Sequence, residues 1–192
     1  NFQKLFGESS FDQSCLLASR LVEAGTRFVT IELGGWDTHQ DNWNRLKSRN
    51  LPTLDSGLSG LLQGLELKGL LETTTVFVTG EFGRTPKINK NGGRDHWSNL
   101  STLAFAGGGL KMGQVIGQAA RKNDVPLSEP LTTSHLLGTV IHTLFDVAAL
   151  RLARGVPREL MSLVEPRCLT SAADDQSTLR TAPWSADVAS LA

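Results

Sequence analysis

The sequence has 192 residues, of which 40% are hydrophobic and 20% are charged, an ordinary composition for a globular domain with a core. Its 19 basic and 19 acidic residues give a formal net charge of zero without a basic run. This balance predicts no binding surface for nucleic acid or anionic lipid. No apolar run is long enough to span a bilayer.

The first half of the chain alternates between helical and strand patterns. Phe11–Ala24 carries apolar residues near a 3.6-residue period and predicts a helix that ends at Gly25. Arg27–Leu33 alternates and is rich in β-branched residues, which predicts a strand. Leu51–Leu71 has a leucine stripe typical of a second helix, and Thr74–Val78 predicts a second strand. This order favours a parallel sheet covered by helices.

The second half contains weaker signals of the same kinds. Ser101–Ala106 predicts a third strand, and Met112–Gly117 predicts a short strand or hairpin arm. Thr133–Leu150 and Pro157–Val164 predict helices, and the last residues, 167–192, predict a loosely ordered tail. We therefore expect an α/β fold with a mostly parallel sheet, helices on both faces, and the three main strands as neighbours.

Polar side chains follow the first two predicted strands at their carboxyl ends. Asp37 and His39 come after the first strand, and Glu81 and Arg84 come after the second. Ligands of an open parallel sheet lie outside the carboxyl ends of its strands. Residues two apart in an extended segment project to the same side, so Asp37 and His39 can face one point.

The long loop from Thr79 to Trp97 adds an Asp95-His96 pair and Arg94. Carboxylates and neutral imidazoles are typical ligands of zinc, and also of manganese or iron. The candidate metal ligands are Asp37, His39, Glu81, Asp95 and His96. Five such groups are enough for two cations, and Arg84 and Arg94 are candidates for binding a substrate oxyanion.

Structural roles for the same residues remain open. Asp37 or Thr38 could N-cap a helix that starts near Gln40, and Arg84 could pair with Glu81 three residues away. Asp95 could orient an imidazole instead of binding a metal, because adjacent residues of an extended chain point to opposite sides.

Five strings occur in this order along the sequence: GGWDTHQDN, LD-x2-L-x2-LL, TGEFGRTPKIN, GRDHW and AGGGLKMGQVIG. In this the chain resembles a large bacterial family catalogued as domain of unknown function 1501, which is grouped with the alkaline phosphatase–sulfatase superfamily. The resemblance runs from about Phe6 to Pro166. It implies an alkaline phosphatase-like α/β/α sandwich that hydrolyses phosphate or sulfate esters. It also implies divalent metal ions, zinc first and manganese or calcium as alternatives, and an exported or periplasmic location.

The chain departs from the superfamily pattern in three ways. Asp37 and His39 are closer together than the corresponding pair in alkaline phosphatases. Phe82 stands where the second metal-binding pair would have its histidine. The strand that supplies a further metal-binding Asp and the nucleophile would lie upstream of Asn1. The resemblance therefore implies that residues 1–166 are the carboxyl-terminal portion of an incomplete domain, with its missing amino-terminal portion as a partner.

Two functions follow from this sequence-based interpretation. The first is a metal-dependent hydrolase of small-molecule or polysaccharide esters, with Arg84 as its catalytic arginine. The alternative is a non-catalytic envelope or polysaccharide-associated binding protein that keeps the fold.

Overall fold

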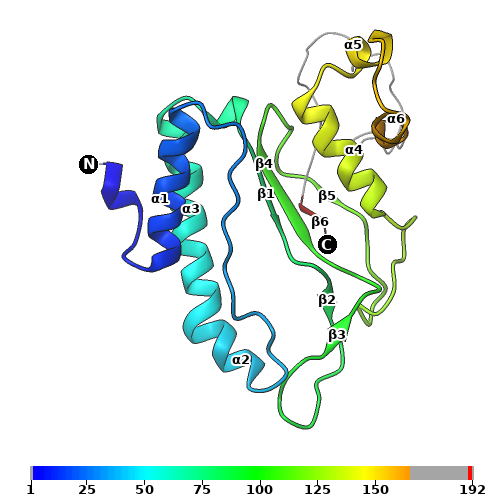
Figure 1. Ribbon diagram of the computed structural model, residues 1–192. Helices are drawn as coiled ribbons and strands as arrows, with labels where there is room; N and C mark the ends of the chain where they lie inside the picture. The colour runs from blue at the N-terminus through cyan, green and yellow to red at the C-terminus, as the bar shows by residue number, and fades with distance from the viewer. Residues whose placement is uncertain (1, 165–189, 192) are drawn as a thin grey trace. The chain divides into compact units, whose positions relative to one another are not determined.

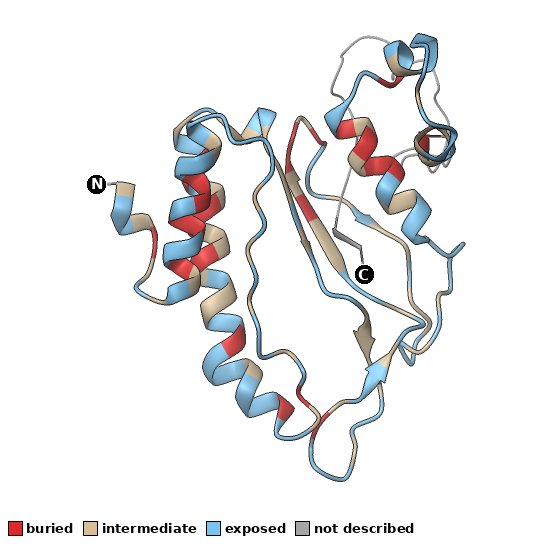
Figure 2. Ribbon diagram, viewed as in Figure 1, coloured by how far each residue is buried: buried red, intermediate tan, exposed pale blue. Residues whose placement is uncertain are grey.

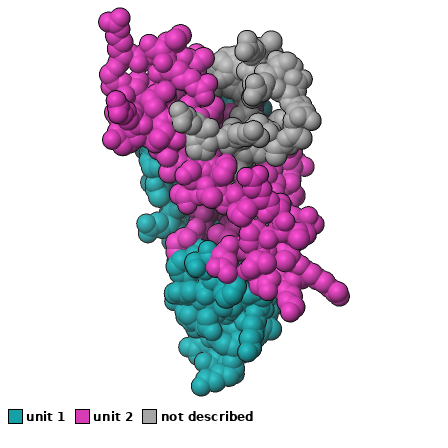
Figure 3. Space-filling model, turned by 90° about the vertical axis from the view of Figure 1, so that its right-hand side faces the viewer, with its two compact units in different colours: residues 1–74, 82–98 teal, residues 75–81, 99–192 magenta. Residues whose placement is uncertain are grey.

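The computed structural model describes residues 2–164 and 190–191 and shows a mixed α/β protein (Figure 1). The chain forms two compact units, drawn in different colours in Figure 3. Unit 1 comprises Asn1–Thr74 and Phe82–Ser98, and unit 2 comprises Thr75–Glu81 and Asn99–Ala192. No helix of the described residues has the length and apolar character needed to cross a membrane.

Unit 1 is built around two helices, α1 and α3, at the positions that the periodicity predicts. A capping box starts α1, because Ser9 Oγ accepts from the Asp12 amide (3.1 Å) while Asp12 Oδ2 accepts from the Ser9 amide (2.9 Å). Gly25 and Gly69, both with positive φ, follow the ends of α1 and α3. The elements of the unit are η1 (Phe2–Leu5), α1 (Ser10–Glu23), α2 (Asn42–Arg45), η2 (Leu46–Asn50), α3 (Leu51–Leu67), η3 (Leu71–Thr73), β2 (Gly83–Arg84) and β3 (His96–Trp97).

The core of unit 1 lies along α1 and α3, where buried residues gather (Figure 2). Cys15 and Leu16 of α1 are buried, as are Leu61 and Leu65 of α3. Burial raises the pKa of the Cys15 thiol to about 11, so this cysteine is a neutral core residue. Cys168 lies outside the described residues.

Glycines on α3 make room for the segments that pack against it. A Cβ atom at Gly60 would stand 2.7 Å from the backbone oxygen of Leu5, and one at Gly57 would stand 2.5 Å from the Phe11 ring. At Gly60 the neighbouring atom is backbone and cannot rotate away. The packing of η1 on α3 therefore requires glycine at this position.

Replacing Gly60 with alanine is expected to lower the free energy of unfolding by about 1–3 kcal/mol through overpacking. The higher helix propensity of alanine offsets about 1 kcal/mol of this loss. Denaturant unfolding measures the difference. Gln63→Ala is the matched control, because Gln63 is exposed on the same helix and should change stability by less than about 0.5 kcal/mol. A Gly60→Ala protein that is more stable than wild type would contradict this packing.

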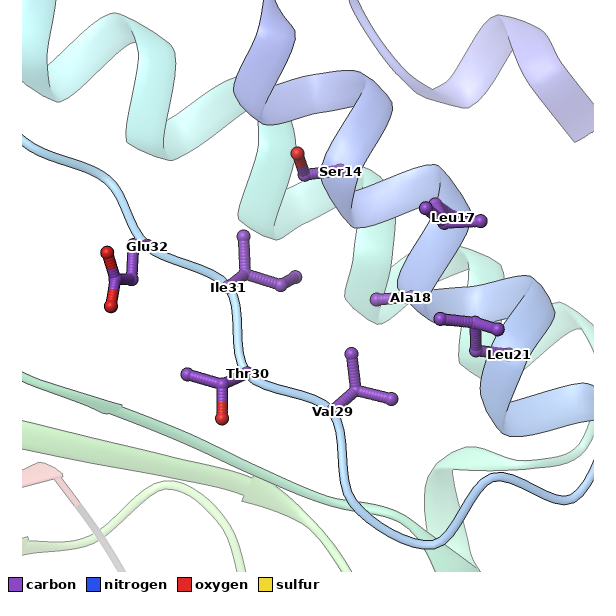
Figure 4. Close-up of a pocket in the computed structure, with 8 residues that line it drawn as sticks. All are labelled: Ser14, Leu17, Ala18, Leu21, Val29, Thr30, Ile31 and Glu32. Atoms are coloured by element: carbon purple, nitrogen blue, oxygen red, sulfur yellow. The ribbon is translucent and has the colours of Figure 1, made fainter.

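The predicted strand Arg27–Leu33 is wrong: this segment is extended but has no strand partner among the described residues. Figure 4 shows Val29 and Ile31 pointing toward α1, whereas Thr30 and Glu32 point away. Side chains of this segment and of α1 line an open pocket of about 220 Å³, and most of its lining is apolar. The alternation therefore reflects one-sided packing on a helix, which sequence alone does not distinguish from pairing in a sheet.

The described residues of unit 2 form a small sheet and three helices. Its strands are β1 (Thr75–Thr79), β4 (Leu103–Gly107), β5 (Val115–Ile116) and β6 (Ser190–Leu191), in the order β1-β4-β6-β5. The helices are α4 (Thr133–Leu144), α5 (Val147–Leu152) and α6 (Arg158–Val164). Residues 167–189 and 192 of the predicted tail lie outside the described part of the chain, as do residues 165–166.

The strands at 75–79 and 103–107 are neighbours as predicted, but their predicted parallel pairing is wrong. They pair antiparallel, with Phe77 opposite Phe105, and among the strands of the described residues only the short β5–β6 pair is parallel. Parallel neighbours need a crossover, usually a helix, whereas no helix lies between β1 and β4 along the chain. The described structure thus shows mixed α/β elements with short antiparallel pairs, and not the predicted parallel sandwich.

The helix predicted over Thr133–Leu150 is two helices in the structure. It stops at Phe145, whose backbone is extended, and Asp146 then caps α5 by accepting from the Ala149 amide (3.0 Å). An aspartate that can bond to the third amide after it favours a new helix start over continuation. Ile141 of α4, Val147 of α5 and Val164 of α6 form one buried cluster.

Candidate metal centre

Two segments that are distant in sequence meet in unit 1 through their backbones. The Arg94 amide donates to the Thr38 carbonyl (3.0 Å), and the amides of Asp41 and Asn42 donate to the carbonyls of Asn91 and Gly92 (3.1 and 3.0 Å). This ladder fixes the segment after Trp36 against the loop that precedes β3. The side chains of both segments are therefore held in one place.

Gly93 allows the two segments to approach closely. It is buried, and a Cβ atom there would overlap the carbonyl group of His39 and the amide nitrogen of Gln40. Only a residue without a side chain fits, so the sequence requires glycine here for space and not for an unusual φ.

Asp37, His39 and His96 bring one donor atom each to a common point. Asp37 Oδ1 lies 3.1 Å from His39 Nε2 and 2.9 Å from His96 Nε2, and the two Nε2 atoms are 3.1 Å apart. Ligand atoms bound to one zinc ion at 2.0–2.1 Å in tetrahedral geometry lie about 3.3 Å from each other. The three residues thus form a candidate metal-binding triad whose spacing and donor types fit a divalent cation.

Arg84 adds a positive charge at the same point. The antiparallel β2–β3 pair sets Arg84 opposite His96, and Arg84 Nη1 donates to Asp37 Oδ1 (2.5 Å). The hydrogen bond from His96, and after it that from Arg84, lowers the pKa of Asp37 to about 2. Asp37 is therefore a carboxylate at neutral pH, as a metal ligand must be.

The triad is open to solvent, because 43% of the His39 side chain, 52% of the His96 side chain and 63% of the Asp37 side chain are exposed. Three protein ligands at an accessible position are typical of catalytic metal sites, whereas structural zinc sites are closed by four. The arrangement leaves room for a substrate or solvent oxygen.

The DUF1501 family, whose description reads "protein of unknown function", matches residues 2–161 of this sequence. The chain belongs to the DUF1501 family. No curated protein and no solved structure is similar enough to count as a match. Membership of this family does not by itself assign a reaction to the chain.

Two of the predicted ligands of this DUF1501 chain are not in the triad. Glu81 belongs to unit 2, outside the group of converging donor atoms. Asp95 instead contacts the other nitrogen of His39, since its Oδ1 lies 2.7 Å from His39 Nδ1. Contact with the His39 ring, followed by that with Asn89, lowers the pKa of Asp95. The alternative role for Asp95, orienting an imidazole, matches this position.

Arg94, the second predicted oxyanion-binding residue, has a different contact in the DUF1501 structure. Its guanidinium lies over the Trp43 ring at 4.9 Å from the ring centroid. This cation–π contact joins the loop before β3 to α2, which gives Arg94 a structural role in unit 1.

The structure also shows the contacts of Asp37, Thr38 and Arg84, for which the sequence allows structural roles. The residue before α2 is Asp41, so neither Asp37 nor Thr38 is its N-cap. Thr38 is buried and donates to Asn42 Oδ1. Arg84 pairs with Asp37 rather than with its near neighbour Glu81.

Sequence reasoning missed Asn89, which the structure places at the centre of the loop. Its side chain contacts His39, Asp95 and two backbone amides. The only sequence signal is its position before the Asn91-Gly92-Gly93 turn, where asparagines commonly bond to the backbone two residues ahead.

Proposed function

We propose that this DUF1501 protein is a metal-dependent hydrolase of phosphate or sulfate esters, related to the alkaline phosphatase–sulfatase superfamily. One observation carries the proposal. Three metal-type donor atoms from Asp37, His39 and His96 converge within 3.1 Å of each other, and the Arg84 guanidinium stands beside them. One cation would satisfy all three donors at once, in place of the hydrogen bonds among the two imidazoles and the carboxylate.

Asp37, His39 and His96 would hold a single divalent cation, with zinc favoured by the two nitrogen donors. Calcium is less favoured, because it prefers six to eight oxygen ligands. When bound, such a cation supplies Lewis-acid polarisation of a phosphoryl or sulfuryl oxygen. The net reaction breaks the bond from phosphorus or sulfur to the ester oxygen and forms one to a water oxygen, releasing an alcohol.

Arg84 would bind the oxyanion of the substrate. Its guanidinium is planar and offers several N–H donors, of which Nη1 is used by Asp37. The remaining donors suit the oxygens of a phosphate or sulfate group, for which arginine is geometrically matched. Because Arg84 lies in β2 and its side chain is only 19% exposed, the guanidinium is held in place.

Arg84→Ala is expected to lower kcat/KM for 4-nitrophenyl phosphate or 4-nitrophenyl sulfate by about 100- to 1,000-fold, because one fixed donor to the developing charge is lost. The kcat/KM of Arg84→Lys should lie between those of wild type and Arg84→Ala, because lysine keeps the charge but not the bidentate geometry. The assay uses the full-length protein loaded with zinc or manganese.

Arg45→Ala is the matched control, because Arg45 is an exposed arginine of α2, and its kcat/KM should equal that of wild type. Hydrolysis that is unaffected by Arg84→Ala would remove Arg84 from the reaction. A full-length protein that binds metal but hydrolyses neither ester would contradict the hydrolase proposal.

The second candidate is a non-catalytic envelope or polysaccharide-associated protein that keeps the metal-type site. The position of Phe82 favours it, because the Phe82 ring packs on the His96 imidazole with their centroids 4.5 Å apart. A phenyl ring thus occupies space where a second metal site would need a polar ligand. Metal binding without turnover in the same assay would support this candidate.

A further inference from the structure

We propose that Asp95 and Asn89 are a positioning pair that fixes the tautomer and orientation of His39, so that Asp95 serves the triad without binding a cation. The inference rests on the proposed metal centre and deepens it. It makes the site mononuclear and assigns roles to two residues that contribute no donor atom to the triad.

The two nitrogens of His39 face opposite partners. Nδ1 lies 2.7 Å from Asp95 Oδ1, whereas Nε2 faces Asp37 Oδ1 and His96 Nε2, each at 3.1 Å. Both ring nitrogens face a carboxylate, but Asp95 makes the shorter contact and has hydrogen-bond geometry, whereas Asp37 lies within ion-pair distance only. Because a carboxylate can only accept, the neutral ring carries its proton on Nδ1 and presents the lone pair of Nε2 to the triad. A carboxylate behind a metal-binding histidine has this effect in many metal centres, where it also raises the basicity of the ligand.

Asn89 holds Asp95 and the His39 backbone together. Asn89 Nδ2 donates to the His39 carbonyl (2.8 Å) and to Asp95 Oδ1 (3.0 Å). Asn89 Oδ1 accepts from the amides of Asn91 (2.9 Å) and Gly93 (3.0 Å). These four bonds use the two donors and two acceptor positions of the amide. The backbone amides fix which end of the side chain is oxygen, so the nitrogen must face Asp95.

Asp95 Oδ1 is therefore engaged by two donors on the side of His39 away from the triad. A second cation at this oxygen would compete with both the imidazole and the amide. This arrangement explains why an aspartate next to His96 in sequence is separate from the group that converges on Asp37. Adjacent residues of an extended segment point to opposite sides, so His96 faces Asp37 while Asp95 faces the far side of His39.

The first test reads the tautomer directly in the metal-free protein. Nitrogen-15 NMR of the histidine side chains is recorded near pH 9, well above the ordinary imidazole pKa of about 6.5. The His39 signals are assigned by their loss in His39→Gln. Wild type should show the proton on Nδ1. Asp95→Ala and Asn89→Asp should show a large population with the proton on Nε2, and Asp95→Asn should keep mostly the wild-type form, because its amide oxygen still accepts.

The second test measures zinc affinity and stoichiometry of the full chain by competition with a chromogenic chelator. Asp95→Ala should weaken binding by about 10- to 100-fold while the stoichiometry stays at one ion per chain. Asp95→Asn should recover part of the loss. Asp55→Ala, which removes an exposed carboxylate on α3, is the control and should leave both measurements at their wild-type values.

The outcomes separate this inference from the proposed function. An unchanged His39 tautomer in Asp95→Ala, or a stoichiometry that falls from two ions to one, would overturn the positioning role. A tautomer that changes in a protein that binds no zinc would support the Asp95–His39 pairing and contradict the metal centre instead. Wild-type zinc binding without ester hydrolysis would leave the positioning role intact and contradict only the hydrolase.

Discussion

The double replacement His39→Ala and His96→Ala is expected to weaken zinc binding by at least about 1,000-fold. Structural zinc sites with four ligands bind with about 10–16 kcal/mol, which corresponds to several kcal/mol per ligand. Removing both imidazoles leaves Asp37 as the single donor of the triad, paired with Arg84. Elemental analysis of the purified full-length protein and a zinc competition titration measure the loss.

His135→Ala is the histidine control for this experiment. His135 lies in unit 2 and accepts from the Thr132 amide at the start of α4 (3.1 Å), so its loss should cost helix-capping stability but no metal. Equal metal content in wild type and the double variant would show that the triad is a set of ion pairs. The hydrolase proposal would then be wrong.

Gly93→Ala should have the second largest effect, although it changes no polar group. The new methyl group would overlap the His39 carbonyl, so the segment that carries Asp37 and His39 must move away from the loop that carries His96. We expect zinc affinity to fall by at least about 100-fold and the free energy of unfolding to fall by about 1–3 kcal/mol, the usual range for overpacking. Calorimetric titration and thermal unfolding measure the two changes.

Gly34→Ala is the matched control, because a Cβ atom there has no neighbour within 4 Å and the backbone φ is not positive. It should match wild type in both measurements. A Gly93→Ala protein with wild-type zinc affinity would show that the backbone ladder between the two segments does not position the triad.

The sequence predicted most elements but not how they pair. Periodicity located α1, α3 and α6, and short apolar runs located β1 and β4, because these signals depend on local burial. The direction of pairing depends on the path of the chain between strands, and the returning path from β1 to β4 carries no distinctive pattern. Val29 and Ile31 illustrate a second ambiguity. An extended segment that packs on a helix has the same alternation of apolar and polar residues as a strand in a sheet.

Sequence patterns also located only some residues of the candidate site, because side-chain orientation depends on how the segments pair. The Asp37-x-His39 spacing gave two members directly, and His96 followed from an acidic–imidazole pair in a long loop. Asp95 and Arg94 could not be separated from His96 by sequence, because their orientations depend on the pairing of β2 with β3. Asn89 acts through four hydrogen bonds that exist only once the loop has folded.

Unit 1 is made of two separate stretches of the chain, and this determines when the triad can form. The His39 and His96 side chains that meet in the triad are separated by 57 positions, and the intervening chain includes β1 of the other unit. Closing a loop of this length in an unfolded chain costs about 4 kcal/mol of entropy, so a cation held at both ends would act as a reversible cross-link comparable to a disulfide. During synthesis the first 74 residues can pair α1 with α3, but the triad forms only after His96 has left the ribosome. With the proposed metal centre, metal loading would be a late event that follows the folding of the helical core.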